Sequence, residues 1–302
     1  MRCGVAPPTV RGWVRRGLCT SPKAGVYVIA GTPPSPQQQL WVGLLAVGFP
    51  VAATGLTNLW CRGLVAIPPA QPQLVVPDQR NPRIAGVLVR RVHHWASMGL
   101  QWQAGVPLVS PAVALLHAAA GLDDPQTLTL VQRMVFDGAL SLDEIRAVNE
   151  GGARGSARLR RSCACYELGI DSPSELDIYE LLRRGRRQPD HCNVALRAPD
   201  GRQSSPVDGY LELGLAYDYD GRESHEGFAA TRRDDRKTAL LESMGVPLLR
   251  LDNRHRRSAR LLYAAMDQAL AALGPPPRIT VVHDRRRRCV CDLWKPIERR
   301  PA

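Results

Sequence analysis

Three aspartates stand in a short segment whose apolar residues otherwise alternate as in β-strands. Asp208, Asp218 and Asp220 lie in 207–225, VDGYLELGLAYDYDGRESH, which predicts two short strands. Side chains at i and i+2 share a strand face, so Asp218 and Asp220 project the same way, and an antiparallel neighbour would place Asp208 beside them. A divalent cation relieves the repulsion of such carboxylates, and Mg²⁺ is usually held by one or two carboxylates, waters and phosphate oxygens.

The segment therefore predicts a Mg²⁺ (or Mn²⁺) site that acts on a phosphate. The alternative is that the aspartates are solvent-facing residues at strand ends and turns. Asp220 is followed by Gly221, and Asp-Gly is a common hairpin signal, so both interpretations stay open on the local pattern.

The basic residues concentrate at the two ends of the chain. The net charge of +12 comes from 40 basic and 28 acidic residues; residues 1–110 hold ten basic residues and one acidic residue, and residues 275–302 hold eight and three. The middle, 111–274, is close to neutral. The ends are therefore the candidate nucleic-acid-binding surfaces.

Near the N-terminus, a helix is expected from Pro7 to Arg16, followed by a two-stranded wing that includes 25–30. Arg11, Arg15 and Arg16 line one edge of this helix, which suits a recognition helix with arginines on phosphates or guanine edges. An ordinary solvated basic face is the alternative.

This stretch, GVAPPTVRGWVRRGLCTSPKAGVYVIAG, resembles the winged-helix region at the N-terminus of AbiEi-type antitoxins. The resemblance implies binding to operator DNA. The family's pattern begins one helix earlier, so we expect a truncated winged-helix-like region over residues 1–35.

Residues 36–150 are expected to form a mixed helix and strand region that also resembles the segment after the winged helix in those antitoxin-like proteins. Helices are predicted at 37–48, at 56–63 and from Ser110-Pro111; strands are predicted at 73–76 and 84–92. A helical segment follows at 124–149, with Ser141 and Glu144 as a capping box. His93, His94 and His117 are interpreted as structural, because no acid or cysteine stands at ligand spacing.

After a glycine-rich linker at 151–160, the order of predicted elements is αβββαβα. The helices are expected at 172–184, 231–244 and 258–273, and the strands at 192–197, 205–212, 215–220 and 246–252. This order, with acids on the second and third strands, is that of the PD-(D/E)XK nuclease core.

Three motifs in this region, SPSELDIYELLRRG, VDGYLELGLAYDYDGRESH and RRDDRKTALLESMGVPLLRLD, resemble the very-short-patch-repair-like endonuclease domain over residues 158–273. The resemblance implies that Asp208 is the first metal aspartate and Asp220 the second acid of the ExD pair. It also implies that His225 is the histidine after Asp-Gly. Asp218 stands where a glutamate is usual, one methylene shorter.

Glu175 matches the family's helical glutamate, but with Ser172 it also forms a capping-box pattern, which we favour over a metal role. Lys237 is the only lysine between residues 161 and 274. It follows the acidic strand on a helix, where it would reach a phosphate or activate water in place of a strand lysine. The alternative is a solvated helix residue.

The paired cysteines, Cys163 with Cys165 and Cys289 with Cys291, are spaced more tightly than the usual zinc motif, so a zinc site is not favoured. The absence of a long apolar run predicts a cytoplasmic chain with no membrane partner.

We thus expect a mixed α+β (α/β) fold, with the winged-helix-like region at 1–35, the middle region at 36–150, a restriction-endonuclease-like αβββαβ domain at 161–274 and a basic disordered tail at 275–302. The expected function is metal-dependent endonucleolytic cleavage of DNA. The alternative is a non-catalytic DNA-binding regulator or type IV antitoxin-like protein with a degenerate nuclease scaffold. A toxin or a second copy of the chain would be possible further partners.

Overall fold

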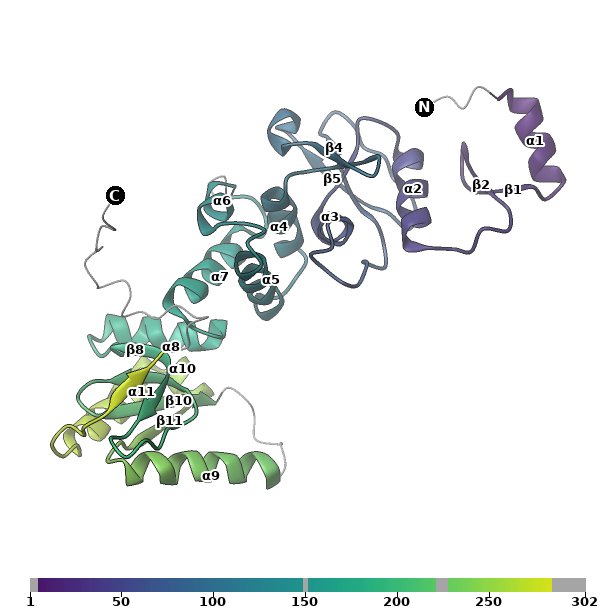
Figure 1. The fold of residues 1–302 in the computed structure, drawn as a ribbon. Coiled ribbons are helices and arrows are strands. Elements are labelled where there is room, and N and C mark those ends of the chain that lie inside the picture. Colours follow the sequence, from purple (N-terminus) through teal and green to yellow (C-terminus); the bar gives the residue numbers. More distant parts are fainter. Residues whose placement is uncertain (1–4, 149–151, 221–227, 284–302) are drawn as a thin grey trace, which may run out of the picture. The chain divides into compact units, whose positions relative to one another are not determined.

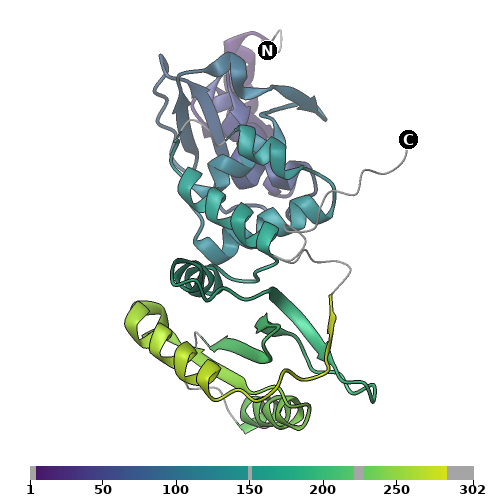
Figure 2. The same ribbon diagram turned by 90° about the vertical axis from the view of Figure 1, so that its left-hand side faces the viewer.

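A computed structural model describes residues 5–148, 152–220 and 228–283, without the side chains of 228–234. The chain is a mixed α+β protein that divides into two compact units (Figures 1 and 2). Unit 1 comprises residues 1–123 and 133–159, and unit 2 comprises residues 124–132 and 160–302. Among the described residues, no helix has the length and apolarity needed to cross a membrane.

Unit 1 begins with helix α1 (Pro7–Arg15) and an antiparallel hairpin of β1 (Cys19–Lys23) and β2 (Val26–Ile29). The helix ends because Gly17 has a φ of 72°, a left-handed conformation that glycine adopts without strain. The hairpin turns at Gly25, also left-handed, so β1 continues to Lys23.

The rest of unit 1 is a five-stranded sheet in the order β5-β4-β3-β7-β6 with helices packed on it. The elements are α2 (Pro36–Val47), β3 (Ala52–Ala53), α3 (Gly55–Cys61), β4 (Gln73–Pro77), β5 (Leu88–Val92), the 3₁₀ turn η1 (Trp95–Met98), β6 (Gln101–Gln103), β7 (Val106–Leu108), α4 (Pro111–Ala119) and α6 (Leu142–Ala147). Helix α5 (Asp124–Phe136) belongs to both units, since residues 124–132 fall in unit 2 and 133–136 in unit 1.

Two local signals in this region fold as expected. The hydroxyl of Ser110 accepts a hydrogen bond from the Val113 N–H at the start of α4. The capping box of α6 is confirmed, because Glu144 N–H donates to Ser141 Oγ at 3.2 Å and Ser141 N–H donates to Glu144 Oε2 at 2.7 Å.

Unit 2 is built on a second five-stranded sheet in the order β11-β10-β9-β8-β12. Strands β10 and β11 pair in parallel and the other neighbours pair antiparallel. The elements are α7 (Ser156–Leu168), α8 (Pro173–Arg184), β8 (His191–Arg197), β9 (Val207–Leu211), β10 (Leu215–Asp220), α9 (Phe228–Ser243), β11 (Leu248–Asp252), α10 (Asn253–Arg257), α11 (Ala259–Ala271) and β12 (Thr280–Val282).

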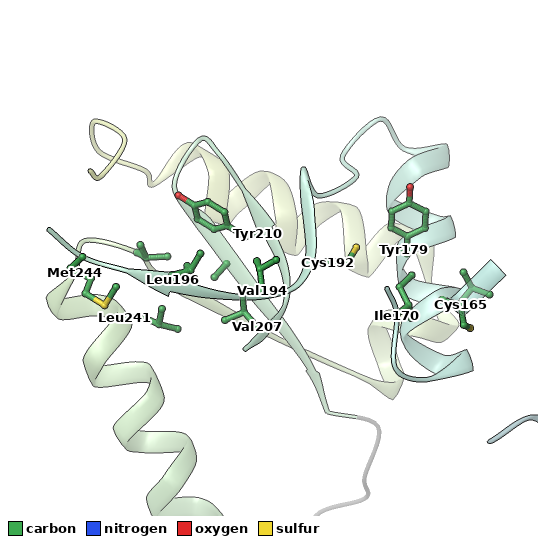
Figure 3. Packing of buried hydrophobic residues seen from close by; sticks show 14 of the residues in the cluster. Cys165, Ile170, Tyr179, Cys192, Val194, Leu196, Val207, Tyr210, Leu241 and Met244 are labelled. Carbon is green, nitrogen blue, oxygen red and sulfur yellow. The ribbon is translucent and has the colours of Figure 1, made fainter. Parts of the chain in front are cut away.

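The sheet of unit 2 has an apolar cluster on each face. On one face, Leu241 of α9 and Met244, directly after this helix, lie against Leu196 and Val207 of the strands (Figure 3). The other cluster joins the strands to α8 and α11. Figure 1 shows α9 (green) on one side of the strands and α8 on the other. Because side chains alternate along β10, its even-numbered residues face the α9 side.

Two predictions about irregular regions need correction. The expected linker at 151–160 contains the start of α7 at Ser156, and the expected disordered tail from 275 contains β12. Thr280–Val282 is a β-branched run that pairs antiparallel with β8, with Val281 opposite Leu196 and packed against the core. Figure 2 shows β12 in yellow alongside β8. Residues 284–302 lie outside the described residues.

Candidate functional site

Two of the predicted carboxylates lie together on neighbouring strands of unit 2. Tyr217 of β10 is opposite Gly209 of β9, so the antiparallel register places Asp218 next to Asp208. The Asp208 N–H donates to Asp218 Oδ1 at 3.3 Å, and the Tyr219 N–H donates to Asp208 Oδ2 at 2.7 Å. Asp218 is buried and Asp208 is partly buried.

A glycine permits this strand pairing. A side chain at Gly209 would overlap the ring of Tyr217, which is buried and packs in the cluster with α8 and α11. Gly209 therefore lets the Tyr217 ring lie across β9 while the two aspartates remain neighbours.

Lys237 reaches the pair from α9. Its Nζ donates to Asp218 Oδ2 at 2.6 Å and to the Pro206 carbonyl oxygen at 2.5 Å. The side chains of Lys237 and Asp218 are 14% and 10% exposed, so the lysine is not a solvated helix residue. One turn further along α9, Leu241 is fully buried in the core, which fixes the helix face that carries Lys237.

A second cation near Asp218 was not anticipated from the sequence. Arg250 is the parallel register partner of Asp218 in β11, and its Nη1 lies 3.4 Å from Asp218 Oδ2. The sequence signal would have been the position of Arg250 in the strand after α9, but only the parallel pairing of β10 with β11 sets the residues opposite each other.

Glu175 caps helix α8. The Glu175 N–H donates to Ser172 Oγ at 3.2 Å, the Ser172 hydroxyl donates to Glu175 Oε1 at 2.7 Å, and the Asp171 N–H donates to Glu175 Oε2 at 3.1 Å. Burial raises the pKa of Glu175 above its ordinary value. Both carboxylate oxygens are thus used in the first turn of the helix, as the capping pattern indicated.

Glu175 nevertheless acts on the aspartate pair. Burial raises the pKa of Asp208 to about 7, and the negative charge of Glu175 adds to the rise, followed by that of Asp218. The Tyr219 N–H and the Lys237 ammonium oppose it. Glu175, Asp208 and Asp218 are therefore electrostatically coupled, and a positive charge placed among them would favour the ionised form of Asp208.

Of the two remaining predicted site residues, Asp220 and His225, the structure describes only Asp220. Asp220 is exposed at the end of β10, opposite Asp252 of β11. In the part of the chain that the structure describes, no three His, Cys, Asp or Glu side chains form a group that could hold a metal ion. The structure thus brings Asp208 and Asp218 together, and the role of Asp220 as a third metal ligand stays a prediction. His225 lies outside the described residues.

The basic edge of the N-terminal helix is open to solvent. Arg11, Arg15 and Arg16 are all exposed on or directly after α1. A hollow of about 570 Å³ between α1 and the hairpin is lined by Arg11, Arg15 and Tyr27, among others. This arrangement gives unit 1 a positively charged helix beside a β-hairpin.

The cysteines described in unit 2 are structural. Cys163 and Cys165 are buried on α7, and burial raises the pKa of Cys165 to about 12, so its thiol is protonated at neutral pH. Cys289 and Cys291 lie outside the described residues.

Comparison with known proteins gives no family assignment. No family model matches the chain, and no curated protein matches it. Among solved structures, it is similar to the crystal structure of the RV2827C protein from Mycobacterium tuberculosis, with 18% identity over 58% of this chain and 69% of that chain and a TM-score of 0.40.

Proposed function

We propose that unit 2 is a divalent-metal-dependent endonuclease that hydrolyses phosphodiester bonds of DNA. The observation that carries the proposal is the contact of Lys237 with Asp218 beside Asp208. Two adjacent acids can hold a divalent metal, and a lysine beside them can contact a phosphate, so this set of groups suits metal-dependent phosphodiester hydrolysis.

The arrangement of the sheet supports the same proposal. An antiparallel run of β8, β9 and β10 is followed by helix α9 and by β11, which pairs in parallel with β10. With α8 in front, this is the αβββαβ order of a restriction-endonuclease-like domain, and the acids stand on its second and third strands.

The donor set fits a hard cation. Asp208 and Asp218 offer only oxygen ligands. Burial, together with the negative charges of Glu175 and Asp218, raises the pKa of Asp208, so a bound cation would favour its ionised form. The two aspartates would hold Mg²⁺ or Mn²⁺, with the remaining positions left to water and phosphate oxygens. The bound cation would supply an acidified water and neutralise the phosphate.

The protein's own groups would have separate tasks. Lys237 contacts the buried Asp218 carboxylate and would donate to a phosphate oxygen that approaches the pair. Glu175 is a positioning residue, because it orders the first turn of α8 and raises the pKa of Asp208. Asp220 or His225 would orient or deprotonate the attacking water.

DNA would be recruited by unit 1. Arg11, Arg15 and Arg16 would contact the phosphates or guanine edges, and the hairpin of β1 and β2 would lie beside the duplex as a wing. The exposure of all three arginines is what this role needs.

A second candidate is a DNA-binding regulator without catalysis, of the antitoxin-like kind. It is favoured by one observation: Lys237 and Arg250 already surround Asp218 with positive charge. In such a protein, the lysine and the arginine would replace the cation permanently, and the nuclease-like sheet would be only a scaffold.

The deciding experiment compares the full chain with Asp208→Asn on supercoiled plasmid in the presence of Mg²⁺ or Mn²⁺. The endonuclease proposal expects nicking by the native chain, loss of nicking in Asp208→Asn and unchanged DNA retention. Asp200→Asn is the matched control, since Asp200 is an exposed acid of unit 2 paired with Arg202, away from the site. If neither chain nicks DNA and both retain it, the regulator is the correct function.

A further inference from the structure

Unit 1 contains a hollow that does not involve the carboxylate pair of unit 2. Its volume is about 460 Å³, and it is lined by residues of β4, β5, α3 and α4 together with Arg154. Small-molecule sites in proteins have volumes of roughly 300–1,000 Å³. The hollow is therefore large enough for a compact organic ligand.

Two arginines contribute the charge of this hollow. Arg90 of β5 is partly buried and Arg154 is exposed, and no acidic side chain is among the lining residues. Within the part of the chain that the structure describes, neither guanidinium has a hydrogen bond or an ion pair. Burial lowers the pKa of Arg90, and the positive charge of Arg154 lowers it further. Among the described residues, no acidic side chain thus pairs with either cation.

A histidine and a threonine complete the polar side of the hollow. Thr54 precedes α3 but makes no cap bond; its hydroxyl instead lies 2.6 Å from His117 Nδ1. Burial lowers the pKa of His117 to about 4, with Arg90 adding to the effect, so the ring is neutral at pH 7. When the Thr54 hydroxyl donates to Nδ1, the ring proton is on Nε2 and is available as a donor.

The remaining lining is apolar. Leu56, Leu88 and Leu122 contribute side chains to the same hollow as the two arginines. Inorganic phosphate would leave these leucines uncovered, whereas the organic part of a phosphate ester would cover them.

We propose that this hollow is a binding site for a small organic phosphate. Its phosphate would lie between Arg90 and Arg154, which match the geometry of phosphate oxygens with planar, forked donors, and its apolar part would lie on the leucines. The site is independent of the proposed nuclease function, because it shares no residue with the aspartate pair.

The test is calorimetric titration of the full chain with phenyl phosphate, followed by inorganic phosphate. Binding of phenyl phosphate is expected at one site per chain and tighter than that of inorganic phosphate. Arg90→Gln and Arg154→Gln should each weaken it by roughly 10- to 100-fold, the value of a charge-assisted hydrogen bond. Arg154 is exposed, so its substitution does not disturb the packing.

Arg91→Gln is the matched control. It removes the same charge from the same strand, but alternation directs residue 91 to the opposite face of β5, and Arg91 is exposed. The affinity of the Arg91→Gln variant for phenyl phosphate should equal that of the native chain. Failure of the native chain to bind phenyl phosphate, or an equal loss in Arg91→Gln, would overturn the proposal. A third outcome would also overturn it: the chain does not bind phenyl phosphate but binds 5′-phosphorylated duplex DNA more tightly than 5′-hydroxyl duplex DNA, and this preference is lost in Arg90→Gln. That result would assign the hollow to the end of a nucleic acid.

Discussion

Replacement of Lys237 by methionine should leave the buried Asp218 carboxylate without its closest counter-ion. Removal of one partner from a buried ion pair costs about 3–5 kcal/mol, because the remaining charge stays desolvated. Here Arg250 remains, with its Nη1 3.4 Å from Asp218 Oδ2 and its side chain 38% exposed, and it screens part of the loss. We therefore expect Lys237→Met to lower the free energy of unfolding of unit 2 by about 2–3 kcal/mol.

The assay is hydrogen exchange along a urea series, read by mass spectrometry on peptides that span β9 and β10. It follows unit 2 without interference from unit 1. Asp218→Asn combined with Lys237→Met removes both charges. The double variant should lose at least about 1 kcal/mol less free energy of unfolding than the sum of the two single losses, and this difference is the coupling energy of the pair. A loss below about 0.5 kcal/mol in Lys237→Met, the size expected for a surface substitution, would refute the buried pair.

Four further outcomes are expected. The free energy of unfolding should fall as pH rises from about 4 to about 7, by at most about 1.4 kcal/mol per pH unit. The reason is that Asp208 keeps its proton up to a pKa of about 7 in the folded chain but releases it near 4 in the unfolded chain. Urea titration at each pH measures this slope, and Asp208→Asn should remove it. Mg²⁺ should raise the unfolding midpoint more at pH 8 than at pH 5, where Asp208 is protonated, and equal shifts at the two pH values would contradict binding at this pair. Gly209→Ala should destabilise unit 2 by about 1–3 kcal/mol, since the new methyl overlaps the Tyr217 ring; an unchanged urea midpoint would show that the ring moves freely. Arg15→Gln should reduce the slope of log affinity for DNA against log salt by about 1, and a fluorescence anisotropy titration that gives the native slope would place the phosphate contacts elsewhere.

The features that depend on neighbouring residues could be predicted from the sequence. Strand β10 has the predicted bounds, and the proximity of Asp208 to Asp218 follows from alternation and an antiparallel turn between them. The capping interactions of Ser172 and Glu175 are also local, since the partners are three positions apart in the sequence.

The features that depend on packing between distant elements could not be predicted. Strand β12 forms because β8 offers a free edge, and nothing near Thr280 signals that edge. Helix α7 begins in a glycine-rich stretch that composition marks as a linker, although its buried Leu159 and Cys165 help to build the core. The electrostatic effect of Glu175 on Asp208 likewise depends on packing, because the two residues are 33 positions apart in the sequence.

The contact of Lys237 with Asp218 combines a local sequence signal with packing between distant elements, and it bears on the choice between the proposed functions. The sequence marked Lys237 by its type and by its place on the helix after the acidic strand, and α9 brings its ammonium to the acid because Leu241 fixes the helix on the sheet. A lysine that served solely as a permanent counter-ion would account for Asp218, which it contacts, but would give no role to the partly buried Asp208 beside it. A cation held by both aspartates would use the pair, which is why the endonuclease is the proposal preferred.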